Sequence, residues 1–357
     1  MRRLIVVALV LVAGAACSGD GGDGAPGAPS APSATSTSAP TAASGAGTAA
    51  PGPTEPPPAA PGLRVVSLNV LHGLFCEPAT DFCDAPNRVA LLLGLLEDAG
   101  CPELVGLQEI GPRQEELIVP ALAGLCEGAY ELVWNPEPGP DREMVLTSLP
   151  VLDERFVDLA GFPWSAHWVR VESPAGPVDF LTTHFASSAN NPPCGPETCP
   201  PLCPVGVETG TCHALEVVDF LDRYADPDGI TVVAGDLNQP VDHPRIRTLL
   251  DAGFVDVWTA AGNPECDPAT GEGCTCCLDD ESDPGVFSGT EAAYDERIDF
   301  VLVRVPARCE LVLDPPGDAD GDGVGTGRFA GTPVADGPGG LTFPSDHAGV
   351  QADLACA

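Results

Sequence analysis

Two polar side chains that follow a short apolar run in the middle of the chain could do chemistry together. Residues 232–235 read Val-Val-Ala-Gly, and Asp236 and Asn238 come just after them. A β-branched run that ends in glycine predicts a buried strand, and alternate residues of an extended chain point to the same side. A carboxylate and an amide at one strand end suit a site that handles phosphate, a metal ion and water. By themselves, however, such residues are more often simple turn formers.

Similar polar residues occur at the ends or beginnings of other apolar runs. They combine carboxylates, imidazoles and a further amide, and they are Asn69, Glu109, His184, Asp299, Asp346 and His347. A single histidine at a strand end is more often structural than catalytic. So many acidic, amide and imidazole side chains at separate strand ends fit a chance distribution poorly. We therefore predict that they converge on one site with Asp236 and Asn238.

The elements that must position these residues alternate between strand-like and helix-like patterns. Apolar runs predict strands at 63–70, 103–110, 144–150, 167–171, 178–184, 232–235 and 297–303. Helical patterns occur at 88–97, 114–125, 214–224 and 244–250. Strands with helices between some of them, and a hairpin around residues 173–176, favour a sandwich of two mixed β-sheets flanked by helices.

The charge of the chain limits the partners that it can hold tightly. The 357 residues carry a formal net charge of -37, with only 15 Lys and Arg together. Such an acidic surface repels polyanions at long range, whereas nucleic-acid-binding proteins usually show a basic footprint. The charge argues against tight non-specific DNA binding, but it allows a weakly bound or metal-bridged phosphate substrate.

The N-terminus predicts export from the cytoplasm. A basic start, Met1-Arg2-Arg3, precedes a short apolar run at 4–13 and small residues just before Cys17. Residues 1–17 resemble a bacterial lipoprotein signal peptide, which is cleaved before a lipidated cysteine; the alternative is an ordinary secretory signal cut near Ala16. Residues 18–61 are Gly, Ala, Pro, Ser and Thr with almost no large apolar residue, which predicts a disordered tether. The folded domain is expected at 62–357, held at a membrane by the lipid anchor and facing outside the cytoplasm.

The cysteine content agrees with an oxidising compartment. Once Cys17 is set aside, fourteen of the fifteen cysteines remain, an even number. Several crowd two loops, at 194–212 and 266–277. In an exported protein such clusters favour disulfides over zinc sites, although their pairing cannot be deduced from the sequence.

Six short motifs in order resemble the endonuclease/exonuclease/phosphatase family, which shares the DNase I-like fold. They are Ser67-Leu68-Asn69-Val70, Gly106-Leu107-Gln108-Glu109-Ile110, Leu181-Thr182-Thr183-His184, Ala234-Gly235-Asp236-Leu237-Asn238, Arg297-Ile298-Asp299-Phe300 and Pro344-Ser345-Asp346-His347. The resemblance spans about residues 63–354. It implies an α+β fold, a four-layer α/β-sandwich of two mixed sheets flanked by helices, and metal-dependent hydrolysis of phosphoesters.

The resemblance also implies a metal site. Glu109 is expected to be the principal ligand of Mg²⁺ or Mn²⁺, hard cations that prefer carboxylate oxygen and keep several waters. Asn69 would help to place the ion and a phosphate oxygen, and Asp346 would approach the same site.

The remaining residues are implied in the attack on phosphorus. His184 and Asn238 would donate hydrogen bonds to phosphoryl oxygens. His347 is expected to deprotonate the attacking water, with Asp299 orienting it and raising its basicity; in parts of the family the position of Asp236 is assigned that role, so both assignments stay open. Glu143 could match a carboxylate that supports the first histidine, or it could be a solvated loop residue.

A second metal loop is suggested by an acidic repeat near the C-terminus. Asp318, Asp320 and Asp322 match the first half of an oxygen-rich Ca²⁺ loop. Phe329 stands at the twelfth position, where an EF-hand needs a bidentate Glu. The alternatives are a structural Ca²⁺ and an acidic loop without a metal.

The sequence therefore predicts an exported, membrane-tethered, divalent-metal-dependent phosphoesterase, expected to be a monomer. Its substrate would be a small-molecule, lipid or nucleic-acid phosphoester. One alternative is a secreted DNase I-like endonuclease, although basic and aromatic residues that would grip DNA are scarce. Another is a non-catalytic binding module on the same fold.

Overall fold

The computed structural model describes residues 62–74, 76, 80–135, 142–161, 163–278, 284–289, 294–315 and 325–357. The predicted signal peptide at 1–17 with Cys17, the tether at 18–61, and Asp318, Asp320 and Asp322 lie outside the described residues.

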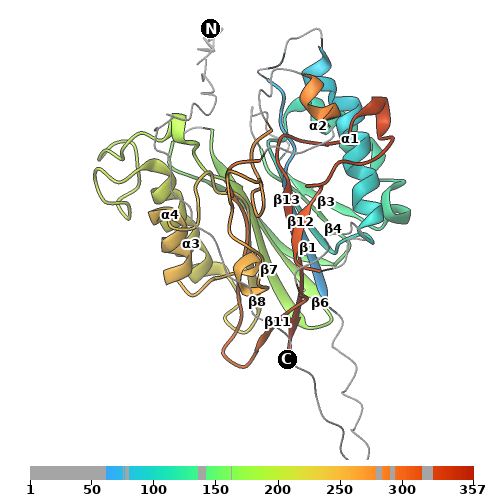
Figure 1. Cartoon of the computed structure of the whole chain (residues 1–357). Helices are drawn as coiled ribbons and strands as arrows, with labels where there is room; N and C mark the ends of the chain where they lie inside the picture. The colour runs from blue at the N-terminus through green and yellow to red at the C-terminus, as the bar shows by residue number, and fades with distance from the viewer. Residues whose placement is uncertain are drawn as a thin grey trace, which may run out of the picture. The chain divides into compact units, whose positions relative to one another are not determined.

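Two mixed β-sheets form the centre of the domain (Figure 1). The first has seven strands: β11 (Leu311–Leu313), β13 (Gly349–Cys356), β1 (Leu63–Asn69), β2 (Leu104–Gln108), β4 (Met144–Thr147) and β3 (Glu131–Trp134) in this order, with β12 (Gly327–Phe329) paired to β13. The second has six strands: β5 (Val151–Asp158), β6 (Ser165–Ser173), β7 (Gly176–His184), β8 (Ile230–Asp236), β10 (Asp299–Arg304) and β9 (Val255–Asp256). Each sheet contains a parallel pair, β1 with β2 and β7 with β8, among antiparallel pairs.

Helices flank the sheets. The α-helices are α1 (Asp81–Asp98), α2 (Pro112–Ala121), α3 (Thr209–Tyr224), α4 (Pro244–Asp251) and α5 (Val257–Ala260). Short 3₁₀ turns occur at Leu125–Gly128, Ser188–Asn190, Pro284–Ser288 and Pro338–Gly340. In Figure 1, α1 and α2 lie on one side of the central strands, and α3 and α4 lie on the other.

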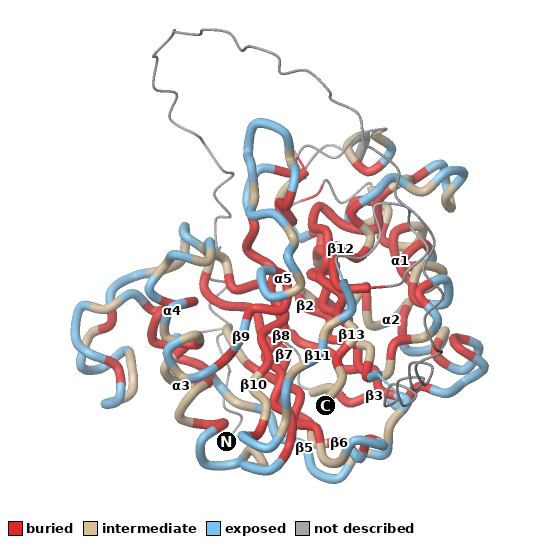
Figure 2. Tube along the Cα trace, turned by 60° about the horizontal axis from the view of Figure 1, so that its bottom comes forward, coloured by how far each residue is buried: buried red, intermediate tan, exposed pale blue. Residues whose placement is uncertain are grey.

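Three apolar clusters hold these layers together. The cluster between the sheets includes Val65 and Val145 from the first and Val232 and Val301 from the second, and Figure 2 shows the central strands as buried. A second cluster packs α1 on β1 and β2 through Val89, Leu92, Leu96, Val66, Leu68 and Val105. A third packs α3 and α4 on the other sheet through Val217, Leu221, Ile246, Leu249, Trp168 and Val233. Each fully buried aliphatic side chain contributes roughly 1.5–3 kcal/mol. The predicted four-layer α/β-sandwich is confirmed.

Some helices and strands begin or end at other residues than the sequence predicts. The helix predicted at 114–125 begins earlier, because Pro112 suits the first turn, and it ends at Ala121. The helix predicted at 214–224 begins at Thr209. Strand β5 was not predicted: its sequence is mainly polar and its residues are mostly exposed, as befits an edge strand.

The fourteen cysteines that follow Cys17 form seven disulfides, so the prediction of disulfides over zinc is confirmed. The pairs are Cys76–Cys83, Cys101–Cys126, Cys194–Cys199, Cys203–Cys212, Cys266–Cys274, Cys276–Cys277 and Cys309–Cys356. This density of disulfides suggests an extracytoplasmic location. None of the helices in the described part of the chain combines the length and apolar character that a membrane span requires.

Candidate active site

Neighbouring strands of the second sheet bring three polar side chains into one row. In the parallel pair of β7 and β8, His184 is the register partner of Asp236. In the antiparallel pair of β8 and β10, Asp236 is the partner of Asp299. Gly235 allows this close approach, because a Cβ at its φ of 151° would overlap the carbonyl oxygen of Thr183. The row crosses the sheet at the end where β8 finishes.

The first sheet supplies the facing half of the site. Asn69 ends β1, and Glu109 comes directly after β2. The amide nitrogen of Asn69 lies 2.9 Å from Oε1 of Glu109 and 3.1 Å from Oδ2 of Asp236. One buried amide therefore joins carboxylates from the two sheets, and the site lies where the ends of their interior strands meet.

His347 lies between two carboxylates of the row. Its Nδ1 lies 3.0 Å from Oδ2 of Asp299, and its Nε2 lies 3.9 Å from Oδ2 of Asp236. All three residues are at most 5% exposed. Asp299 thereby fixes the imidazole so that Nε2 faces Asp236.

His184 and Asn238 lie on the other flank of Asp236. The amide nitrogen of Asn238 is 2.8 Å from Nε2 of His184 and 2.9 Å from the carbonyl oxygen of Phe185. The backbone N–H of Asn238 donates to Oδ1 of Asp236 at 2.8 Å. Asn238 adopts a left-handed φ of 56°, a conformation that Asn tolerates better than most residues.

Asp346 is attached to the same cluster through its neighbour. Oγ of Ser345 lies 2.6 Å from the carbonyl oxygen of Asn69 and 3.1 Å from Oδ1 of Asp346. Asp346 is 4% exposed. The structure therefore brings all the site residues expected from the sequence into one cluster, apart from the candidate calcium ligands, which are not described.

The surroundings of the cluster shift the pKa values of two carboxylates, Glu109 and Asp236, in opposite directions. Burial alone would raise the pKa of Glu109, but the charges of His72 and His184 and hydrogen bonds from Asn69 and the His72 backbone lower it to about 2. Burial raises the pKa of Asp236 to about 6, against the opposing charges of His184 and His347. Glu109 is thus a permanent anion near neutral pH, whereas Asp236 can exchange a proton.

The pKa of His347 is shifted in the opposite direction to that of an ordinary buried histidine. Burial lowers its pKa, but the charge and hydrogen bond of Asp299 and the charges of Asp346 and Asp236 raise it well above the usual value. Near neutral pH the ring is therefore an imidazolium that faces Asp236.

The donor set fits a hard cation at Glu109, an ionised carboxylate whose side chain is 13% exposed. Within the described ranges, the groups of three Asp, Glu, His or Cys ligand atoms that lie within 4.8 Å of one another are Cys194-Cys199-Cys212, Cys276-Cys277-His347 and Asp236-Asp299-His347. Glu109 belongs to none of them, so a cation there would keep several waters, as Mg²⁺ does. The buried Asp236-Asp299-His347 group is a second place for a cation, which would have to displace the proton that His347 carries near neutral pH.

Two groups that contact the site residues were not predicted from the sequence: His72 and the Cys276–Cys277 disulfide. The backbone N–H of His72 donates to Oε2 of Glu109 at 3.0 Å, and its Nδ1 lies 3.5 Å from the same oxygen. Its signal was the short spacing from Asn69, three residues earlier. The second neighbour is the Cys276–Cys277 disulfide, which contacts His347. The sequence shows only that these two residues belong to a cysteine-rich loop.

Glu143 and Phe329, two further residues named from the sequence, are both buried. Glu143 is buried, and its carboxylate accepts a hydrogen bond from Ser165; it is not the solvated loop residue that was the alternative. Phe329, at the twelfth position of the acidic loop, is a core residue packed in the α1 cluster and is 4% exposed.

Two mixed sheets flanked by helices are the DNase I-like fold, and in this chain acidic, amide and imidazole side chains meet at the strand ends of both sheets. The chain belongs to the endonuclease/exonuclease/phosphatase family, whose sequence model matches residues 66–347. No protein of curated function matches the sequence.

Solved structures share this fold at low sequence identity. The endonuclease/exonuclease/phosphatase from Bacteroides vulgatus has a TM-score of 0.55 and 17% identity, covering 83% of this chain and 99% of the other. D. rerio TDP2 complexed with a single-strand DNA product has a TM-score of 0.54 and 17% identity, covering 82% and 98%. The human Nocturnin catalytic domain with a bound sulfate anion has a TM-score of 0.52 and 13% identity, covering 83% and 94%.

Proposed function

We propose that the chain is an extracytoplasmic, divalent-metal-dependent hydrolase that cleaves a phosphodiester or phosphomonoester by attack of water. Members of its family are metal-dependent phosphoesterases. The observation that carries the proposal is the pair of contacts from Asn69 to Glu109 and Asp236, because it joins an ionised carboxylate to a carboxylate of raised pKa in one cluster.

Glu109 would hold Mg²⁺ or Mn²⁺, with Asn69 orienting its carboxylate and Asp346 close by. A bound cation would neutralise phosphate charge and stabilise the leaving alkoxide. The charge of Glu109 is kept available for this by His72 and Asn69, which hold its carboxylate in the ionised form.

The electrostatics favour Asp236 as the base that accepts the proton of the attacking water. A general base works best when its pKa is near the operating pH, and the pKa of Asp236 is about 6. His347 is less suited to this role, because Asp299 keeps its ring protonated. His347 would instead donate from Nε2 to the phosphoryl oxygens.

His184 and Asn238 would complete the group of hydrogen-bond donors when a substrate displaces the contact between the Asn238 amide and Nε2 of His184. Both flank Asp236, so an oxyanion that develops beside Asp236 would meet their side chains. Donors held in place before the reaction stabilise developing charge without reorganisation.

Small or lipid phosphoesters suit the charge better than nucleic acid does. The net charge is -37. Three arginines near the motifs are occupied internally: Arg142 pairs with Glu115, Arg297 pairs with Asp256, and Arg245 donates to the carbonyls of Ala186 and Leu237. The TDP2 complex with a DNA product is the observation that favours the second candidate, a secreted endonuclease.

The test compares bis-p-nitrophenyl phosphate and p-nitrophenyl phosphate hydrolysis with Mg²⁺, with Mn²⁺ and with EDTA. Asp236→Asn serves as the inactive control, because it keeps the size of the side chain. Plasmid nicking and choline release from sphingomyelin then separate nuclease from lipid substrates. Absence of metal-dependent turnover on every substrate would favour a non-catalytic binding module.

The N-terminal residues would deliver this domain to a membrane. We propose that 1–17 are a signal peptide ending at a lipidated Cys17, that 18–61 are a disordered tether, and that the domain at 62–357 acts as a monomer. Mass spectrometry of the mature N-terminal peptide checks this. A diacylglycerol adduct on Cys17 that is lost in Cys17→Ser is expected, and an unmodified N-terminus near Ala16 or Cys17 would instead indicate simple secretion.

A further inference from the structure

The loop that carries Cys276 and Cys277 is fixed by backbone hydrogen bonds on both sides of the site. The N–H of Cys276 donates to the carbonyl of Glu296 at 2.9 Å. On the other side, the N–H of Leu278 donates to the carbonyl of Asp346 at 2.9 Å, and the N–H of Ala348 donates to Thr275 at 2.7 Å. The position of this loop therefore depends on main-chain bonds as well as on its disulfide.

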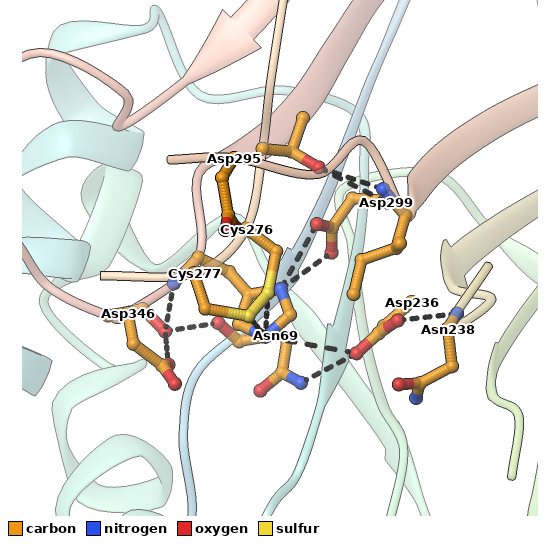
Figure 3. The surroundings of a disulfide bond; sticks show 12 residues. Asn69, Asp236, Asn238, Cys276, Cys277, Asp295, Asp299 and Asp346 are labelled. Atoms are coloured by element: carbon orange, nitrogen blue, oxygen red, sulfur yellow. Dashed lines mark hydrogen bonds and ion pairs between the residues drawn. A yellow bond between two sulfur atoms is a disulfide. The ribbon is translucent and has the colours of Figure 1, made fainter. Parts of the chain in front are cut away.

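Both sulfur atoms face the imidazole nitrogen that points into the site. Sγ of Cys276 lies 3.7 Å from Nε2 of His347, and Sγ of Cys277 lies 4.0 Å from the same atom. Cys276 is buried, whereas Cys277 is partly exposed, so a reagent in solvent can reach the bond from the Cys277 side. Figure 3 shows the disulfide beside Asp236, Asp299 and Asp346.

We propose that Cys276, Cys277 and His347 form a latent site for a thiophilic divalent cation, which opens when the Cys276–Cys277 disulfide is reduced. In that step a dithiol reductant supplies two electrons and two protons, the sulfur–sulfur bond breaks into two thiols, and the reductant closes to its own disulfide. A cation that then binds both sulfurs as thiolates together with Nε2 of His347 releases the two thiol protons and the proton that Nε2 carries in the imidazolium.

The geometry of the three ligand atoms suits a soft cation. All three lie within 4.8 Å of one another, and the two sulfurs, which are bonded in the disulfide, become separate ligand atoms when it is reduced. In a tetrahedral site with metal–sulfur bonds of about 2.3 Å and metal–nitrogen bonds of about 2.0–2.1 Å, sulfur and nitrogen ligands are about 3.5 Å apart. The sulfurs of this site already stand close to that distance from Nε2. Thiolate ligands select soft or borderline metals over Mg²⁺, and Asp236, Asp299 and Asp346 add negative charge nearby.

Occupation of this site would switch the enzyme off. This consequence rests on the proposed function, because it assumes that Nε2 of His347 serves the substrate. A cation bound to Nε2 removes that nitrogen from the phosphoryl group. The oxidised protein, in which both sulfurs are bonded to each other, would not bind the cation here.

The experiment measures Cd²⁺ binding by the ultraviolet thiolate-to-Cd²⁺ charge-transfer band, so it does not depend on any activity. The mature protein is treated with dithiothreitol, freed of it under argon, and titrated with Cd²⁺; differential alkylation and mass spectrometry identify the reduced cysteines. Cys276→Ser/Cys277→Ser is the site variant. Cys194→Ser/Cys199→Ser removes another short-range disulfide and is the matched control.

We expect the reduced wild type and the matched control to bind one Cd²⁺ that the site variant lacks. His347→Ala is expected to weaken this binding by more than about tenfold, because one of three ligands is lost. Equal Cd²⁺ binding by the reduced wild type and the site variant would overturn the proposal, and so would unchanged binding by His347→Ala.

Phosphoesterase activity is then measured with excess Mg²⁺ as a ratio with and without Cd²⁺ within each protein. We expect loss only in the reduced proteins that keep both cysteines. If the protein hydrolyses no phosphoester at all, the proposed function fails while the spectroscopic titration still decides the site.

Discussion

Asp236 and Asp299 are cross-strand partners in the pair of β8 and β10, and the His347 ring lies between their carboxylates, 3.9 Å from one and 3.0 Å from the other. The two acids have different partners. Asp299 contacts Nδ1 of the imidazole. Asp236 instead accepts hydrogen bonds from the side-chain amide of Asn69 and the backbone N–H of Asn238. Strand register sets the two carboxylates side by side, and the position of His347 then gives Asp299 the contact with Nδ1 and leaves Asp236 opposite Nε2.

Removing the charge of Asp299 is expected to disable His347. In Asp299→Asn the pKa of His347 falls, because the Asp299 charge and hydrogen bond are main contributions that raise it against burial. We expect turnover to fall by about a hundredfold or more and the alkaline limb of the pH–rate profile to move to lower pH. Asp153→Asn, at an exposed position on β5, is the control. An alkaline limb that stays in place would contradict the role given to Asp299.

The acid limb of the same profile is expected to belong to Asp236. A base must be deprotonated to accept a proton, so activity should rise with pH and reach half of its plateau near the Asp236 pKa of about 6. If His347 were the base, activity would rise only above its raised pKa. Asp236→Asn should lower kcat by about 10²–10⁴-fold and abolish the limb. Residual activity that keeps the limb would point to another base.

The site residues that could be predicted from the sequence are those at the ends of apolar strands. Asn69, His184 and Asp236 follow buried runs, and a strand end near a glycine or turn is a local feature. The sandwich also followed from local patterns. Its strand order did not, because the antiparallel pairing of β1 with β13 joins residues at opposite ends of the domain.

Contacts that depend on tertiary packing could not be predicted from the sequence. The contact of Cys276 with His347 joins positions 71 residues apart, and no local pattern records it. Strand β5 also escaped prediction, because an exposed edge strand has no apolar face to show. The opposite pKa shifts of Glu109 and Asp236 likewise depend on tertiary structure, through the burial of each carboxylate and the charged groups that lie near it in space.

Cation binding is expected to depend on the charge of Glu109. Glu109→Gln keeps the oxygen that receives the Asn69 amide but removes the negative charge that a hard cation requires. We expect Mn²⁺ affinity, measured by calorimetry or by electron paramagnetic resonance of free Mn²⁺, to fall by about tenfold or more. Glu116→Gln, in the exposed part of α2, should leave the affinity unchanged. Equal affinities of Glu109→Gln and wild type would place the cation elsewhere, with the Asp236-Asp299-His347 group as the next candidate.

A buried histidine away from the site is expected to weaken the fold in acid. His167 is 1% exposed, and neither ring nitrogen has a hydrogen-bond partner among the described residues. Burial lowers its pKa to about 3, whereas the unfolded chain keeps about 6.5. Between these values the unfolded state binds the extra proton, so this group lowers the free energy of unfolding by about 1.4 kcal/mol for each unit that pH falls. His167→Phe, beside the ring of Phe156, should therefore unfold at higher urea than wild type, with a gap that widens from pH 6.5 to pH 4. A constant gap over this range would show that His167 is protonated in the folded protein.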